Sequence, residues 1–337
     1  MKRVELIKTL DVVSRGLSNN NIAPTFGFFC FTGETVFSWN DQVAIVGLCK
    51  VDKPFGCHGA TLLGLLKCCS SDEVDIEVTK DNLLITSGSS DFKLPYISQE
   101  EFLWKEPEVH EANLQEPELF EAIKACVATT SSDIALGAFN QICLMSTNEA
   151  VIVYSCDGDA ITKVTVTGEV LAFENACISK SFAEALSKLD IGIPDLFLEG
   201  EWIAAYADSY HIYGRNLGPP QLDYEAEIRK SVGINNYKFV PIPKELNNAL
   251  SRARVVADAE TKPTQFIINN KNIYLGTFTP YGDVDDIVGC DHLDIKANIS
   301  AAMLQKSLEG CTEFCVTENC VLLKGERILR LLANLGE

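Results

Sequence analysis

Closely spaced cysteine and histidine residues are the first candidates for chemistry in this sequence, because both residue types bind metal ions. They occur as Cys57-His58, as Cys290-x-His292 and as the group Cys311, Cys315 and Cys320. A structural zinc site usually takes its ligands from paired C-x-x-C spacings. None of these groups has that spacing, and several of the cysteines fall within apolar strand patterns. We therefore expect no metal site.

Carboxylates form two further clusters. Asp283-x-Asp285-Asp286 lacks the glycine and the distal glutamate of a calcium-binding loop, so we expect an exposed acidic loop. In Cys156-Asp157-Gly158-Asp159, the Asp-Gly pair favours a tight turn, because glycine readily takes the positive φ that such a turn needs. A catalytic pair of carboxylates at this turn stays open as an alternative. The sequence has no nucleophile elbow, phosphate loop, dinucleotide fingerprint or H-E-x-x-H motif, so we expect neither an enzyme nor a bound cofactor.

Basic residues recur on predicted helices, opposite the apolar residues. Three first helices share an i, i+4, i+7 apolar stripe, which marks one buried face: Leu6, Leu10 and Val13; Leu119, Ile123 and Cys126; Leu246, Leu250 and Ala253. The basic residues that we assign to the exposed faces of these and later helices are Lys8, Arg15, Lys124, Lys180, Lys188, Lys244, Arg252 and Lys306. Such residues are common on any solvated helix. Their recurrence at comparable positions equally fits a shared role in binding phosphates.

The elements that carry these residues form a three-part repeat of first helix, strands, second helix and strand pair. The second helices carry Leu62-x-x-Leu65-Leu66, Phe182-x-x-Ala185-Leu186 and Leu304-x-x-x-Leu308. Apolar or alternating runs between the two helices predict strands, for example 26–31, 42–51, 142–145, 151–154, 265–268 and 272–278. We therefore predict an α+β fold of three repeated domains, 1–107, 108–230 and 231–337, each a β-sheet backed by two α-helices.

Composition limits where the protein works and what it binds. The net charge is −19, but the acidic residues concentrate at 100–121, 223–227 and 283–294, which we expect to be linkers and loops. An odd number of cysteines, 13, predicts free thiols in a reducing compartment. No stretch reaches the length of a membrane span and the N-terminus has no signal region. We therefore expect a soluble, cytoplasmic protein with no membrane partner.

The middle copy carries the most specific pattern. Phe139-Asn140-Gln141-Ile142-Cys143-Leu144, then the run 151–154, leads into Cys156-Asp157-Gly158-Asp159-Ala160-Ile161. This pattern resembles the strand pair of the bacterial sliding clamp family, the β subunit of the replicative DNA polymerase, which ends in a Thr-Asp-Gly-His-Arg-Leu turn. Asp157, Gly158 and Ile161 match, whereas Cys, Asp and Ala replace the Thr, His and Arg. The runs 84–95 and 178–180 are also similar to the family's Ser-Gly turn with its Phe-x-Leu-Pro strand and to its Val-Pro-Arg-Lys helix entry. The short, divergent chain favours a bacteriophage or plasmid version.

The resemblance implies that the chain is half of a six-domain ring. Two chains would join head to tail into a homodimer around double-stranded DNA, with sheet edges of the first and third domains meeting at the joint. The basic helix faces would line the pore and contact phosphates independently of base sequence. An acidic exterior would repel DNA from the other surfaces. The implied partners are a DNA polymerase, which the ring tethers for processivity, and a clamp loader.

The resemblance also implies a hydrophobic pocket between the second and third domains, which takes short partner peptides. By position, one wall consists of Phe139, Cys156, Gly158, Asp159 and Ile161. The other wall consists of Pro241, Ile242, Val255, Val256, Leu331 and Leu332. Each apolar member also fits an ordinary core. Asp159, which replaces the family's histidine, makes the rim more acidic and favours peptides with a basic residue.

Two other functions stay open at this point. A clamp-like chain could serve mainly as a docking platform for transcription or repair factors. An unrelated enzyme or a structural virion protein would form no ring. A toroidal dimer would exclude the unrelated protein, and retention on circular but not linear DNA would distinguish sliding from ordinary binding.

Overall fold

The computed structural model of the 337-residue chain describes residues 1–18, 23–108, 113–114, 117–167, 175–188, 194–207, 209–232, 238–256, 264–279, 282–291 and 294–335. The chain divides into two compact units. Unit 1 comprises Met1–Pro117 and Ser181–Leu217, and unit 2 comprises Glu118–Lys180 and Gly218–Glu337. In the described ranges, no helix is long and apolar enough to cross a membrane.

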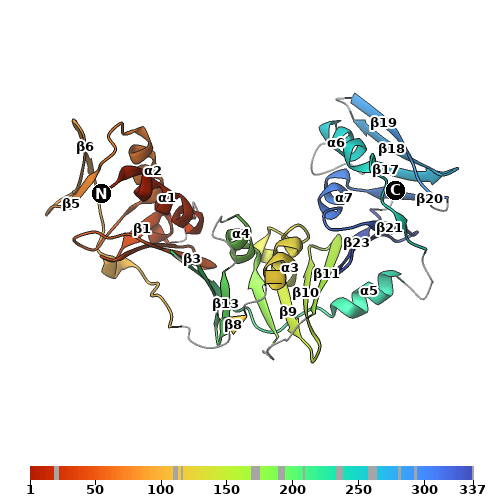
Figure 1. The fold of residues 1–337 in the computed structure, drawn as a ribbon, viewed down its shortest axis with the longest axis horizontal. Helices are drawn as coiled ribbons and strands as arrows, with labels where there is room; N and C mark the ends of the chain where they lie inside the picture. The colour runs from red at the N-terminus through yellow and green to blue at the C-terminus, as the bar shows by residue number, and fades with distance from the viewer. Residues whose placement is uncertain are drawn as a thin grey trace. The chain divides into compact units, whose positions relative to one another are not determined.

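An eight-stranded antiparallel sheet forms the centre of unit 1 (Figure 1). Its strands, in spatial order, are β4 (Phe55–His58), β1 (Phe28–Phe31), β2 (Thr35–Trp39), β3 (Val43–Leu48), β15 (Tyr210–Arg215), β14 (Trp202–Ala207), β13 (Asp195–Glu199) and β8 (Asn113–Leu114). A smaller sheet consists of β5 (Asp75–Val78), β6 (Leu83–Ser87) and β7 (Ser90–Leu94). Because β3 pairs with β15, segments far apart in the sequence share one sheet.

Helices α1 (Arg3–Val13) and α2 (Gly59–Cys68) pack on the β1–β4 part of this sheet. The predicted stripe of α1 is buried, because Leu6, Leu10 and Val13 expose 4% or less of their surface. Helix α4 (Lys180–Lys188) places Phe182 against β15. A Cβ atom at Gly214 would lie 2.6 Å from that ring, so glycine permits the close packing. Three short 3₁₀ helices are η1 (Ser14–Gly16), η2 (Pro24–Gly27) and η3 (Gln99–Glu101).

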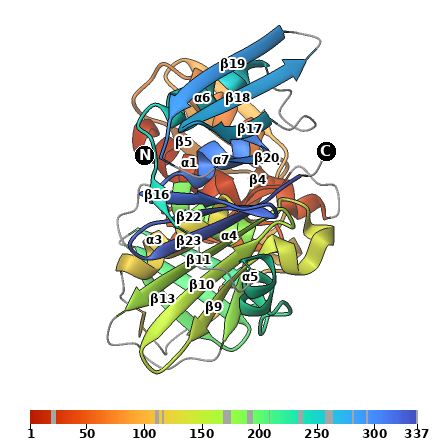
Figure 2. The same ribbon diagram turned by 90° about the vertical axis from the view of Figure 1, so that its right-hand side faces the viewer.

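Unit 2 contains a second eight-stranded antiparallel sheet (Figure 2). Its order is β12 (Ala176–Ser179), β9 (Gln141–Ser146), β10 (Ala150–Cys156), β11 (Ala160–Thr167), β23 (Ile328–Ala333), β22 (Cys320–Lys324), β21 (Glu313–Val316) and β16 (Val240–Pro241). A four-stranded sheet follows the order β19 (Gly282–Gly289), β18 (Asn272–Thr279), β17 (Thr264–Asn269) and β20 (Ile295–Ile299). The pairing of β11 with β23 joins the predicted second and third repeats.

The helices of unit 2 are α3 (Pro117–Val127), η4 (Ile134–Asn140), α5 (Tyr224–Val232), α6 (Leu246–Val256) and α7 (Ala301–Ser307). The apolar stripes of α3 and α6 are buried as predicted. Helix α6 packs on α7 and on β18 and β19. The predicted α+β fold is therefore confirmed, and each predicted first and second helix is present.

Three local predictions are wrong. Residues 223–227 are not a loop, because α5 begins at Tyr224 and buries Tyr224 and Ile228. The cluster Asp283 to Asp286 lies in edge strand β19, where exposed positions alternate with partly covered ones, rather than in an acidic loop. Residues Pro24–Gly27 form a 3₁₀ turn, so β1 starts only at Phe28.

Candidate DNA-facing surface and partner site

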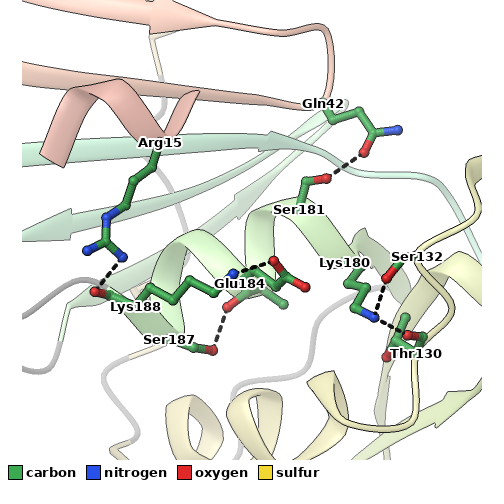
Figure 3. A network of polar contacts seen from close by, with 10 residues as sticks. Arg15, Gln42, Thr130, Ser132, Lys180, Ser181, Glu184, Ser187 and Lys188 are labelled. Carbon is green, nitrogen blue, oxygen red and sulfur yellow. Dashed lines mark hydrogen bonds and ion pairs between the residues drawn. The ribbon is translucent and has the colours of Figure 1, made fainter. Parts of the chain in front are cut away.

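Three of the predicted DNA-facing residues belong to unit 1. Lys8 is exposed on α1, and within the described residues its ammonium has no ion pair or hydrogen bond. Arg15 lies in η1, past the end of α1, and donates to the carbonyl oxygen of Lys188 at 2.6 Å (Figure 3). Lys188 pairs with Glu184 one turn earlier, at 2.6 Å between Nζ and Oε2. The structure thus brings Arg15 and Lys188 together, with one carboxylate beside them.

Two basic residues near the first half of unit 2 are held by local contacts. The Lys124 ammonium lies 3.0 Å from Glu121 and 5.0 Å from the centre of the Phe120 ring. Lys180, the first residue of α4, donates to the Thr130 carbonyl at 2.5 Å and to the Ser132 hydroxyl at 2.9 Å (Figure 3). Lys180 therefore anchors the loop that follows α3.

Of the remaining three predicted DNA-facing residues, one forms an ion pair and two do not. Arg252 of α6 forks the carboxylate of Asp286, with Nη2–Oδ1 at 2.7 Å and Nε–Oδ2 at 2.9 Å. Lys244 lies in the exposed turn before α6, and Lys306 is exposed on α7. In the part of the chain that the structure describes, neither lysine has a side-chain partner. In these ranges, Lys8, Lys244 and Lys306 are thus the predicted members whose ammonium groups have neither an ion pair nor a hydrogen bond.

Sequence reasoning also missed Lys67 and Arg254, which lie on a predicted second helix and a predicted first helix. Lys67 of α2 pairs with Asp11 of α1 at 2.7 Å. Arg254 of α6 donates to the side-chain oxygen of Gln305 on α7 at 2.6 Å. Arg254 follows Arg252 by two residues, and Lys67 lies in the last turn of α2, where a cation is favoured by the helix dipole. Both residues lie on helices that the apolar spacing predicts, so listing every Lys and Arg of those helices would have found them.

Part of the predicted peptide pocket forms one row across five strands of unit 2. Cys156 lies opposite Ile161, Ile161 opposite Leu331, and the row continues through Leu322 to Cys315. All five residues belong to one apolar cluster, against which the partly buried Phe139 packs. The structure therefore brings Phe139, Cys156, Ile161 and Leu331 together.

Helix α5 supplies the side of this cluster that sequence reasoning missed. Tyr224 and Ile228 are buried in it, and Leu222 packs against it from just before the helix. The Tyr224 ring stacks on Tyr154, with centroids 5.0 Å apart and planes 16° apart. The signal was present in the sequence, because Tyr224 and Ile228 have the i, i+4 spacing of an amphipathic helix. We call these residues the outer cluster: Phe139, Cys156, Ile161 and Leu331, with Tyr224 and Ile228 of α5 and the partly buried Leu222 and Leu329.

The turn between β10 and β11 borders the outer cluster. Gly158 has φ +102°, which explains the need for glycine there. The Asp157 carboxylate accepts from the backbone N–H groups of Asp159 and Ala160 at 3.0 and 2.8 Å. Asp159 is exposed, and its carbonyl accepts from the Ala333 N–H at 2.7 Å. Asp157 therefore shapes the turn, while the Asp159 carboxylate is presented to solvent.

The other predicted pocket residues lie elsewhere in unit 2. Leu332 packs into a second cluster on the opposite face of the sheet, because successive strand residues point to opposite faces. Ile242 packs on that same cluster, and Pro241 lies in edge strand β16. Four strand spacings separate β16 from β11, which is roughly 19 Å. Val255 is 84% exposed on α6. Val256 ends α6, and its side chain lies outside the described residues.

Polar contacts beside the outer cluster perturb several pKa values. The Lys163 ammonium, together with the Tyr154 hydroxyl, lowers the pKa of Glu225, because both donate to its carboxylate. Burial and the same carboxylate raise the pKa of Tyr154. Burial raises the pKa of Cys156 to about 11, which keeps it a thiol at neutral pH. The protonated thiol is a weak nucleophile, so Cys156 fits a packing role better than a reactive one.

The described residues contain no group of three or more His, Cys, Asp or Glu side chains that could hold a metal ion. His292, one member of the Cys290-x-His292 pair, lies outside them. All 13 cysteines are described, and all are free thiols.

Comparison with solved structures gives matches over the full length of this chain. No protein-family model matches the sequence, and no curated protein does. A putative DNA polymerase III β subunit from Eubacterium rectale aligns with a TM-score of 0.83 and 13% identity, covering 100% of this chain and 98% of that one. A Pseudomonas aeruginosa sliding clamp bound to griselimycin gives 0.81 and 15%, covering 100% and 98%. A Caulobacter crescentus sliding clamp gives 0.81 and 16%, covering 100% and 99%. From end to end, this chain therefore has the fold of the DNA polymerase III β-subunit sliding clamps.

Proposed function

We propose that this chain is a DNA sliding clamp, a non-enzymatic ring subunit that encircles duplex DNA and tethers a DNA polymerase. The observation that supports the proposal most is the full-length match to sliding clamps, which covers nearly all of both chains. A match to part of the chain would have indicated only one domain in common. This match extends over all three predicted repeats. The cysteine content fits a cytoplasmic protein, and a bacteriophage or plasmid origin stays a prediction.

The proposed assembly is a homodimeric ring of three domains per chain, 1–107, 108–230 and 231–337. Each proposed domain contains one predicted first helix and one predicted second helix: α1 and α2, α3 and α4, α6 and α7. A closed head-to-tail contact would remove exposed sheet edges, which otherwise promote aggregation. A clamp loader would open this ring to place it on DNA.

The DNA contacts are proposed for the helix surfaces. Among the described residues, the ammonium groups of Lys8, Lys244 and Lys306 have no partner, and they would contact phosphates most directly. Lys124 and Lys188 sit in exposed ion pairs, which are worth little and can exchange a carboxylate for a phosphate. Arg252 is held by a two-bond contact to the partly covered carboxylate of Asp286 and is less available. Contacts of this kind read no base sequence, as sliding requires.

The outer cluster is proposed as the peptide site for polymerase and loader. Its partly buried members, Phe139, Leu222 and Leu329, give an apolar surface beside a buried row, which is the composition of a peptide-binding hot spot. Leu222 and α5 replace Pro241, Ile242, Val255 and Leu332 in this proposal. The exposed Asp159 carboxylate would attract a basic residue of the peptide.

Topological binding to DNA tests the ring. The purified protein should have twice the 37.0 kDa mass of the chain and appear as a toroid by electron microscopy. Loaded onto nicked circular DNA, it should stay bound and be released when the circle is linearised. A monomeric particle without a hole would overturn the proposal. Equal retention on linear and circular DNA would instead indicate ordinary binding, as a docking platform would show.

A peptide titration tests the outer cluster separately. Phe139→Ala should weaken binding of a synthetic bacterial clamp-binding peptide by about tenfold or more, because a central apolar contact is lost. Val255→Ala is the matched control, since Val255 is an exposed apolar residue outside the cluster. Asp159→His should strengthen binding of peptides without a basic residue relative to those with one. If all three variants bound the peptides with equal affinity, the outer cluster would be refuted as the peptide site. That result would leave the proposed ring unaffected.

A further inference from the structure

Helix α5 lies on the sheet residues of the outer cluster, the surface that we propose for partner peptides. Within the described ranges, it is the α-helix that contributes residues to this cluster, whereas α6 and α7 belong to the cluster on the opposite face. The Tyr224 ring stacks on Tyr154, and Ile228 is buried one turn later. Partner helices bind apolar grooves through side chains with this i, i+4 spacing. Here a segment of the chain itself makes such contacts.

The apolar contact that holds α5 is small. Of the nine residues of this helix, Tyr224 and Ile228 are buried, whereas Arg229 and Lys230 are exposed. A helix of this length is barely stable by itself in water. Packing on the sheet therefore keeps α5 folded, and a segment with stronger apolar anchors can take its place.

An ion pair joins α5 to the sheet. The Glu225 carboxylate accepts from the Lys163 ammonium of β11 and from the Tyr154 hydroxyl of β10, both at 2.5 Å. Solvent reaches this pair, because the Lys163 side chain is 27% exposed and that of Glu225 40%. Among the described residues, Lys163 has no other ion pair. Departure of α5 would leave Lys163 without its carboxylate, which favours a displacing segment that carries one.

We propose, on the basis of the peptide site proposed above, that α5 occupies this site in the free chain and that a partner segment displaces it. The partner segment brings two apolar side chains in place of Tyr224 and Ile228, and a carboxylate that pairs with Lys163. The sheet residues of the outer cluster receive the partner. Because only the chains with α5 released are competent to bind, α5 lowers the apparent affinity for every partner.

Two buried thiols in contact with α5 report its release. Cys143 Sγ lies 3.5 Å from the Tyr224 hydroxyl, and Cys320 Sγ lies 3.8 Å from the Ser231 carbonyl oxygen. Cys126 of α3 is buried outside the outer cluster and serves as the control thiol. Pulses of N-ethylmaleimide on the full-length protein, read by peptide mass spectrometry, give the modification rate of each thiol.

Exchange of the two charges tests how α5 is held. Lys163→Glu and Glu225→Lys should each speed modification of the two reporter thiols by roughly two- to fivefold, the value of a solvent-accessible ion pair. The double exchange restores the pair and should return both rates toward those of the wild type. Lys230→Gln is the matched control, since Lys230 pairs with Glu227 within α5 and not with the sheet. The control thiol should react equally slowly in all variants.

A peptide titration tests displacement. The probes are a synthetic bacterial clamp-binding peptide with Glu beside its apolar anchor and a matched peptide with Gln. Glu225→Lys should bind the Glu peptide about two- to fivefold more tightly than the wild type does, because α5 competes less. Lys163→Glu should remove the preference for Glu over Gln. Bound peptide should speed amide hydrogen exchange in α5, measured by mass spectrometry.

The outcomes separate displacement from the peptide site itself. If the peptides bind and exchange in α5 is slowed or unchanged, α5 is a fixed wall and displacement is wrong, while the peptide site stands. If the peptides bind neither the wild type nor Glu225→Lys, the peptide site and displacement are both refuted. Reporter thiols that react alike in the wild type and in both single variants, with folding verified by circular dichroism, would also overturn the proposal.

Discussion

The carboxylate of Glu106 joins three aromatic side chains of unit 1. It lies 2.9 Å from Nδ1 of His211 and accepts from the Tyr213 hydroxyl at 2.6 Å, while Tyr213 also bonds to Tyr206 at 3.2 Å. The hydrogen bond with His211, and secondly that with Tyr213, lowers the pKa of Glu106 below its ordinary value of 4.5. Glu106 thus ties the chain that follows η3 to strand β15.

Acid should weaken this contact. Because the pKa of Glu106 is lower in the folded state, its ionised form stabilises folding above the unfolded-state pKa of about 4.5. That stabilisation is lost as the pH falls through the lower, folded-state pKa. Glu106→Gln should therefore reduce the loss of stability between neutral and acidic pH, measured as urea midpoints at each pH. An identical pH dependence in wild type, Glu106→Gln and the exposed control Glu77→Gln would contradict this assignment.

Cysteine burial predicts which thiols react. Burial raises the pKa of Cys30 and Cys126 to about 12, so both stay protonated and unreactive at neutral pH. Cys68 is exposed at the end of α2, and Cys69 is half-buried. In the native protein, iodoacetamide should modify Cys68 first, as read by peptide mass spectrometry. Early modification of Cys30 or Cys126 would show that the core opens locally.

At the scale of elements, the buried Arg330 links two helices of unit 2. Its guanidinium donates to the carbonyls of Ser307 and Glu309 at the end of α7, at 2.6 and 2.5 Å. It also donates to the carbonyl of Ala125 in the last turn of α3, at 3.1 Å. Helix C-termini leave carbonyls unpaired and favour a cation, so one side chain caps both helices.

Replacing Arg330 should loosen both helices together. Arg330→Met keeps an apolar stem but leaves three buried carbonyls without this donor, at an expected cost of about 3 kcal/mol. Arg327→Met is the control, because among the described residues the Arg327 side chain forms only an exposed ion pair, with Glu118 on the same unit. It should therefore destabilise the protein much less than Arg330→Met. Urea denaturation followed by circular dichroism measures both. Equal destabilisation of the two variants would contradict the capping role.

Some basic residues of the proposed DNA-facing helices are in ion pairs and others are not. The salt dependence of DNA binding should distinguish the two kinds. Each cation that neutralises one phosphate contributes about 0.9 to the slope of log affinity against log salt. Lys306→Ala should therefore reduce the slope more than Lys124→Ala, since Lys124 is paired with Glu121. The measurement is the affinity for a short linear duplex, titrated over a series of low salt concentrations at which charge contacts are least screened. A larger change of the slope in Lys124→Ala than in Lys306→Ala would contradict the prediction that Lys306 contributes more to phosphate binding.

At the scale of the whole molecule, the net charge of −19 opposes ordinary DNA binding. A strongly acidic protein repels a polyanion except where basic residues gather. We expect a short linear duplex to show no saturable binding in the micromolar range at an ionic strength of about 0.15 M. The same protein loaded on a circle should persist there, because topology rather than affinity holds it. Tight binding to the linear duplex would argue against a sliding ring.

The local elements of this protein could be read from the sequence, because their signals are local. Apolar spacing identified α1, α3 and α6, and the Asp-Gly pair identified the turn at Gly158, whose positive φ is a property of that residue. Predictions failed where a strand or helix carries acidic residues on its exposed side. Residues 223–227 and 283–286 were assigned to loops on charge, although tertiary packing covers the opposite face of each.

Local residue spacing was enough to predict that one helix–strand pattern occurs three times, that each copy has a buried helix stripe, and that cations recur opposite those stripes. Tertiary structure alone decided which residues meet. Pairing of β11 with β23 puts Ile161 beside Leu331 and turns Leu332 to the other face, since neighbouring strand residues alternate. It also decided that α5, not the Pro241–Ile242 connector, covers the outer cluster. Strand register and ion pairing depend on residues far apart in the chain, and no local spacing encodes them.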